Sequence, residues 1–113
     1  MGRFSRNKGA RAEREAAAEI RRLFGVEACR GAQHRGGPDA PDVRTTIDGV
    51  HFEVKRTEAL RLWDALAQAV ADAGNNVPVV LHRSNGKPWI AVVRLDDLPR
   101  LATQLYLTLA SNA

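Results

Sequence analysis

The chain has 113 residues, of which 44% are hydrophobic and 27% are charged, and its formal net charge at pH 7 is +4. This length suits one compact domain, and the composition excludes a disordered chain. A single cysteine excludes an internal disulfide, and no apolar run approaches the roughly 20 residues that cross a bilayer. We therefore expect a cytoplasmic protein with no signal peptide and no membrane span.

The positive charge is concentrated at the start of the chain. Residues 1–22 contain seven basic and three acidic residues, whereas the remaining residues contain ten of each. A localised basic segment is typical of a surface that binds a polyanion, most simply nucleic acid. A solubilising tail is the alternative on charge alone.

Residues 1–9 lack a hydrophobic period, so we expect a flexible basic arm, followed by a single domain over residues 10–113. The alanine-rich start of that domain predicts a helix over residues 10–24. At about 100° per residue, Glu13 lies within the apolar stripe of this helix, close to Phe24. The alternative is a glutamate at the edge of the stripe that reaches solvent.

The rest of the domain predicts alternating strands and helices around a hairpin. Residues 26–34, 77–83 and 88–95 predict strands, and residues 60–74 predict a helix with Trp63 on its buried face. An apolar helix ends the chain. The resulting order, α-β-β-β-α-β-β-α, predicts an α/β fold with a mixed sheet and helices on its faces.

Residues 41–55 predict the hairpin, because Asp48 and Gly49 form a strong signal for a two-residue turn. In the register set by this turn, Val43 faces Val54 on the apolar side of the hairpin.

The other side of the predicted hairpin gathers charged residues. Asp42 is expected opposite Lys55, and Glu53 points the same way as Lys55 because the two are two residues apart on one strand. His51 shares this side; we expect it to be exposed to solvent, with a supporting role at the site as the alternative. A surface lattice of charges is the alternative for the whole set.

Carboxylates that converge on a sheet face bind a hard cation such as Mg²⁺ or Mn²⁺ through oxygen. No cysteine and histidine cluster has the spacing of a zinc site. A divalent cation beside a basic surface suits phosphodiester hydrolysis, because it lowers the pKa of a bound water. Lys55 would neutralise charge that develops on the phosphate, and Glu13 would complete the metal ligands.

Pro41-Asp42 followed by Glu53-Val54-Lys55 matches the PD-(D/E)xK motif of the restriction-endonuclease-like nucleases. The run from Lys8 to Glu13 resembles the start of the first helix in archaeal-type and phage Holliday junction resolvases of that superfamily. The short length and the αβββαβ order of the core are similar as well. The resemblance covers roughly residues 6–95.

This resemblance implies a metal-dependent DNA endonuclease, in a prokaryotic cell or a phage-infected host. It implies catalysis with Mg²⁺ by Glu13, Asp42, Glu53 and Lys55, with Gln68 on the following helix helping to position the site. It also implies a homodimer that cuts four-way junctions. The last helix is a candidate dimer face, and ordinary core packing is the alternative.

The chain departs from the resolvase pattern in one respect and is ambiguous in another. Some resolvases place a functional serine before the PD aspartate, but residues 6–83 contain no serine. The chain also has two Pro-Asp pairs, ending at Asp39 and at Asp42. We choose Asp42, because it enters the strand whereas Asp39 lies in a loop rich in glycine and proline.

Basic side chains are expected to contact the DNA backbone, since guanidinium groups match phosphate oxygens. Such contacts read DNA shape more than base sequence. Two other functions stay open: a nuclease of this fold that acts on other DNA (a nickase, flap, single-strand or restriction-type enzyme), and a DNA-binding module without catalysis. The expected phosphate contacts are Arg3, Arg6, Lys8, Arg11, Arg30, Arg35, Arg44 and Arg56.

Overall fold

The computed structural model describes residues 2–31 and 41–112, with the side chains of α1 described from Gly9 onward. The elements follow the predicted order, with one 3₁₀ helix added before the last α-helix. In chain order they are α1 (Gly2–Phe24), β1 (Ala28–Arg30), β2 (Val43–Thr45), β3 (Val50–Arg56), α2 (Leu62–Ala73), β4 (Val77–Arg83), β5 (Ile90–Val92), η2 (Leu95–Asp97) and α3 (Leu98–Ser111).

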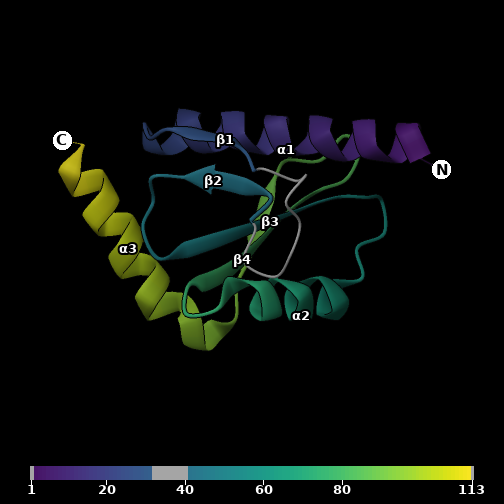
Figure 1. Cartoon of the computed structure of the whole chain (residues 1–113). Coiled ribbons are helices and arrows are strands. Elements are labelled where there is room, and N and C mark those ends of the chain that lie inside the picture. The colour runs from purple at the N-terminus through teal and green to yellow at the C-terminus, as the bar shows by residue number, and fades with distance from the viewer. Residues whose placement is uncertain (1, 32–40, 113) are drawn as a thin grey trace.

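The strands form one mixed sheet, as predicted. Their order is β1-β2-β3-β4-β5, so each strand lies beside its neighbours in the sequence. Among the described strands, only β3 and β4 pair in parallel, and the chain crosses between them through α2. α1 and α2 lie on opposite sides of the sheet, and α3 lies at one end of it (Figure 1). This is an α/β fold with helices on both faces of a mixed sheet.

Each face of the sheet packs against its own helix. Phe52 and Val54 of β3 belong to the larger buried cluster, together with Ile20 of α1. Val80 of β4 packs with Ala69 of α2 in a smaller cluster on the other face. The two clusters arise because successive side chains of a strand point to opposite faces.

The hairpin forms, but its predicted register is wrong by two residues. Val43 pairs with Phe52, whereas the two-residue turn placed it opposite Val54. The connection between β2 and β3 is longer because Ile47 turns inward and is buried at 3% exposure. Asp48 does not adopt the positive φ that a type I′ turn requires, although Gly49 does, at +76°. A shift of two residues keeps every side chain on its predicted face.

Helix boundaries and faces also differ from prediction at two places. α1 is helical from Gly2, although the sequence predicted a helix only from residue 10. Trp63 is 76% exposed, so its assignment to the core is wrong. α2 begins only at Leu62, which places Trp63 in the first turn. The helix approaches the sheet through smaller side chains further along, such as Ala65 and Ala69.

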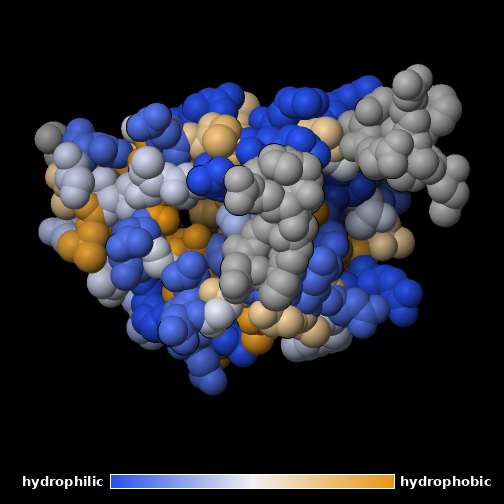
Figure 2. Space-filling model, in the orientation of Figure 1, coloured by the Kyte–Doolittle hydropathy of each residue, from blue (hydrophilic) through white to orange (hydrophobic). Residues whose placement is uncertain are grey.

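No described residue of α3 is buried. Leu101 and Leu105 pack partly against the core, whereas Tyr106 and Leu109 are exposed. Figure 2 shows hydrophobic atoms at the surface on the side where α3 lies. Among the described residues, no helix combines the length and hydrophobicity that a membrane crossing requires.

Candidate active site

Asp42 lies immediately before β2 and is held against β3 by backbone contacts. Its N–H donates to the carbonyl of Phe52 at 3.0 Å, and its Oδ2 accepts a hydrogen bond from the N–H of Val54 at 2.8 Å. The carboxylate is therefore fixed beside the strand that carries Glu53. In the observed register Asp42 is not opposite Lys55, so that predicted cross-strand pair is wrong.

Glu53 is the most deeply buried charged residue among those described, at 2% exposure. Its Oε1 lies 2.8 Å from Nε2 of His51, which is itself 3% exposed. Burial raises the pKa of the Glu53 carboxyl above its ordinary value of 4.5; the neighbouring Asp42 raises it further, and the His51 contact opposes the shift. Glu53 is thus a buried acid with one hydrogen-bonding partner, His51, and one acidic neighbour, Asp42.

Glu13 reaches Asp42 from α1. Its side chain is only 12% exposed, which confirms the inward orientation predicted from the apolar stripe. Oε1 accepts a hydrogen bond from Nε of Arg30 at 2.8 Å. Burial and Asp42 raise the pKa of Glu13, while Arg30 lowers it. Asp42 therefore lies within hydrogen-bonding reach of both glutamates, and three carboxylates from three separate segments converge.

Lys55 follows Glu53 on the same side of β3 and faces α2. Its ammonium donates a hydrogen bond to Oε1 of Gln68 at 2.8 Å. The structure thus brings Lys55 and Gln68 together, although they are thirteen residues apart.

The carboxylates have the donor chemistry that a hard cation prefers, since their oxygens cluster and the charge of Asp42 raises the pKa of both Glu13 and Glu53. Over residues 2–31 and 41–112, however, no three acidic, histidine or cysteine side chains are spaced as a preformed ligand set. Glu13 and Glu53 each direct one oxygen to a protein partner, Arg30 and His51. The residues fit a divalent cation in type, but one oxygen of each glutamate is engaged by a protein partner.

Two residues play parts that the sequence did not reveal. The expectation that His51 is exposed is wrong, because it is buried against Glu53. The alternation along the strand indicated only that His51 lies on the same side as Glu53. Arg30, expected to contact phosphate, instead pairs with Glu13 across from β1 to α1.

The other predicted phosphate contacts are scattered more widely. Arg11 and Arg44 are exposed. Arg56 is partly buried and donates to Oδ1 of Asn85 at 2.9 Å. The remaining predicted contacts lie outside the described side chains, namely Arg3, Arg6, Lys8 and Arg35.

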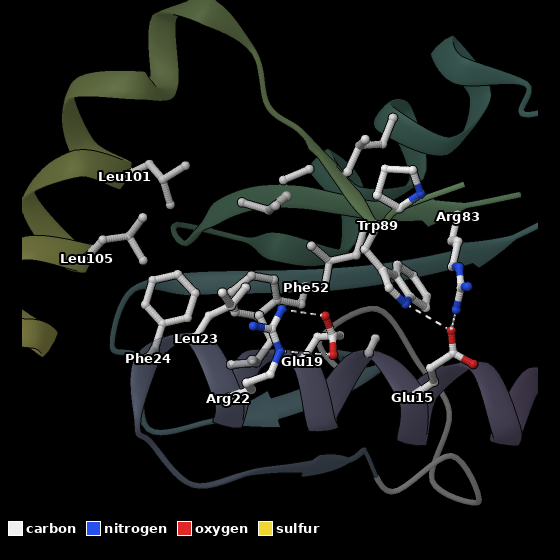
Figure 3. Close-up of a pocket in the computed structure, with 17 residues that line it drawn as sticks. Glu15, Glu19, Arg22, Leu23, Phe24, Phe52, Arg83, Trp89, Leu101 and Leu105 are labelled. Atoms are coloured by element: carbon white, nitrogen blue, oxygen red, sulfur yellow. Dashed lines mark hydrogen bonds and ion pairs between the residues drawn. The ribbon is translucent and has the colours of Figure 1, made fainter. Parts of the chain in front are cut away.

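A separate hollow of about 560 Å³ lies between α1, β4, β5 and α3, and its lining is largely apolar. Leu101 and Leu105 of α3 point toward it (Figure 3). At its edge, Glu15 of α1 accepts hydrogen bonds from Arg83 and, at 2.9 Å, from Nε1 of Trp89. The lining includes none of the predicted catalytic residues, so this hollow is not the carboxylate site.

No protein-family model matches the chain, and no curated protein matches it. Among solved structures, it matches Hjc of Archaeoglobus fulgidus, a Holliday junction resolvase from an archaeal hyperthermophile. The sequence identity is 26% and the TM-score 0.56, over 76% of this chain and 72% of that chain. The match confirms the predicted resemblance to archaeal-type Holliday junction resolvases. In fold, this chain is similar to an archaeal Holliday junction resolvase.

Proposed function

We propose that this protein is a metal-dependent DNA endonuclease that cuts four-way junctions. The observation that supports this most directly is the convergence of Glu13, Asp42 and Glu53, with Lys55 on the same strand as Glu53. Burying the Glu53 carboxylate at 2% exposure beside a second carboxylate costs free energy, which distinguishes this set from a lattice of surface charges. The similarity to a resolvase supplies the substrate class.

Asp42 and Glu53 would hold Mg²⁺ or Mn²⁺, with Glu13 as a third ligand. The bound cation would polarise the phosphoryl oxygen and lower the pKa of a bound water. Lys55 would place its ammonium beside the phosphate, where negative charge increases during hydrolysis. Gln68 would restrict the Lys55 side chain through the 2.8 Å hydrogen bond, so that the ammonium is held in place before the substrate arrives.

The basic start of α1 would contact the DNA backbone, together with the exposed Arg11 and Arg44. Such contacts are made to phosphate and carry no direct base information, so recognition would depend on the shape of the junction. A DNA substrate and a single thiol fit a reducing compartment such as the cytoplasm.

A four-way junction is cut symmetrically only if two active sites face it, so the proposal includes a homodimer. The exposed apolar side chains of α3 and the open outer edge of β5 offer a surface for a second copy. Neither is covered by another part of the described chain.

The test is cleavage of a synthetic four-way junction with Mg²⁺, beside linear duplex, flap and single-stranded DNA of the same sequences. We expect paired nicks in the junction and little cleavage of duplex. Preferred cleavage of another substrate would assign a different nuclease activity to this fold. Salt-sensitive binding without cleavage of any DNA, in Mg²⁺ or Mn²⁺, would assign a binding module.

A further inference from the structure

His51 and Glu53 form a buried pair that the proposed mechanism does not yet use. Their exposed fractions are 3% and 2%, and their nearest polar atoms are 2.8 Å apart. A buried carboxylate costs free energy unless a hydrogen-bond donor or a charge compensates it. Asp42, the acidic neighbour of Glu53, adds to that cost instead of relieving it. His51 is therefore the described side chain that compensates Glu53.

The backbone around this pair is fixed on both sides. β3 pairs with β2 on one edge and with β4 on the other, and the parallel register places His51 beside Pro78 and Glu53 beside Val80. Side chains two residues apart on a strand point the same way, so the imidazole and the carboxylate start from a set separation. A contact in this setting fixes the direction of the carboxylate with little loss of rotamer freedom.

The partner of Glu53 differs in kind from the partner of Glu13. Glu13 is paired with Arg30, a permanent cation that competes by charge with any metal ion. An imidazole can donate a hydrogen bond while it is neutral. A neutral His51 would then leave the negative charge of Glu53 available to a cation, and it would engage only one of the two carboxylate oxygens.

We propose that His51 is a positioning residue for cation binding: its Nε2–H donates to Oε1 of Glu53 and turns Oε2 toward Asp42 and the ion. This inference rests on the proposed function, because it requires the cation site. Partners that orient metal ligands typically change metal affinity about 10–100-fold when they are removed. The side chain of His51 itself does not touch the ion or the substrate.

The test measures Mn²⁺ binding to the full chain without DNA, by calorimetric titration and by the rise in melting temperature. His51→Leu removes the donor, and we expect Mn²⁺ to bind roughly 10–100-fold more weakly. In His51→Gln the amide nitrogen takes the place of Nε2, so affinity should stay within about threefold of wild type. In His51→Asn the shorter amide cannot reach Oε1, and the loss should match that of Leu. His82→Leu is the matched control, because His82 lies on β4 and bonds the carbonyl of Thr57 instead of a carboxylate.

The outcomes separate the two proposals. If wild type binds Mn²⁺ and Asp42→Asn does not, while His51→Leu and His51→Asn bind as wild type does, the positioning role is overturned and the cation site stands. If wild type and Asp42→Asn bind Mn²⁺ equally weakly, the cation site itself is overturned. Should His51→Leu fail to fold, the contrast between His51→Gln and His51→Asn decides, because both keep a polar side chain in the same pocket.

Discussion

Glu53 shows the conflict between folding and function at a single residue. Burying a carboxylate costs several kcal/mol before any partner compensates it. The chain accepts this cost on a central strand, beside a second carboxylate and a histidine. An apolar residue in its place would satisfy packing alone. The proposed cation would explain why the chain accepts this cost.

Replacing either central carboxylate should abolish cleavage and spare DNA binding. Asp42→Asn and Glu53→Gln remove the charge that would hold the cation, while the basic surface is unchanged. Junction cleavage in Mg²⁺ should fall by at least about 100-fold, and affinity measured in Ca²⁺ should change by less than about threefold. Asp96→Asn and Glu27→Gln change exposed acids outside the site and serve as controls. Full activity in either site variant would contradict the metal assignment.

Without divalent cations, the free energy of unfolding should decrease as pH rises above about 4.5. The native pKa values of Glu13 and Glu53 are raised above 4.5, so the native state retains protons that the unfolded chain releases. Their favourable contribution is present below the unfolded pKa and is lost as pH rises through the native pKa.

Urea unfolding in EDTA, from pH about 4.5 to about 7, measures this slope. Glu53→Gln should make the decrease shallower, because one of the two groups no longer titrates and its amide oxygen still accepts from His51. Glu27→Gln, at an exposed position, should leave the slope unchanged. An identical slope in wild type and Glu53→Gln would show that burial of this carboxyl does not shift its protonation.

The PD-(D/E)xK motif predicted Asp42, Glu53 and Lys55 as site residues. The hydrophobic period of the first helix predicted that Glu13 faces inward. The side chains that form hydrogen bonds with these residues could not be predicted from the sequence. Arg30 was predicted to contact phosphate, but a guanidinium binds a carboxylate equally well. Its pairing with Glu13 follows from the approach of β1 to α1, which the sequence does not show. The burial of His51 depends on what covers that face of the sheet, which no local pattern contains.

At the scale of elements, the kinds and order of strands and helices were predictable, and their exact pairing was not. The hairpin register depends on Ile47, whose burial in the core lengthens the connection beyond the two residues of the Asp48-Gly49 signal. The face of α2 was misjudged for a similar reason. Large side chains such as Trp63 dominate a hydrophobic period, but close packing on a sheet favours the small ones.

The basic start of α1 should contribute to DNA affinity mainly through charge. Deleting residues 1–8 removes three positive charges, and the slope of log affinity against log salt should become shallower by up to about 3. The first buried residue described in α1 is Ala12, so the deletion leaves the packed part of the helix in place.

Binding to a labelled junction at several salt concentrations measures the slope. A full-length variant with glutamine at the three basic positions is the matched control for helix length: Arg3, Arg6 and Lys8. If both variants keep the wild-type slope, this segment does not contact phosphate. A change in the deletion alone would attribute the effect to the length of the helix instead of its charge.

At the scale of the whole molecule, the apolar surface is distributed unevenly. Both faces of the sheet centre are covered by α1 and α2, whereas α3 leaves Tyr106 and Leu109 exposed at 70% and 47%. Stable interfaces are built around such aromatic and aliphatic residues. We therefore expect the interface of the proposed homodimer to involve α3.

Introducing charge on α3 should convert the proposed dimer to a monomer. The double variant Tyr106→Glu and Leu109→Glu places two carboxylates in the expected contact without disturbing the core, since both positions are exposed. Sedimentation velocity should show the mass of one chain, with an unchanged far-ultraviolet spectrum. Ala71→Glu, at an exposed position on α2, should leave the dimer intact. If the α3 double variant is still a dimer, as Ala71→Glu is expected to be, the interface does not involve α3.

Cys29 is the only cysteine of the chain, and it is exposed on β1, next to the arginine that holds Glu13. A thiol-reactive dye or spin label would thus attach at one position, and no background substitution would be needed. The label would lie one residue from Arg30, so its spectrum would report on any release of the ion pair when a cation or a junction binds. In a homodimer each chain would carry one spin label, and electron spin resonance would measure the distance between the two β1 strands.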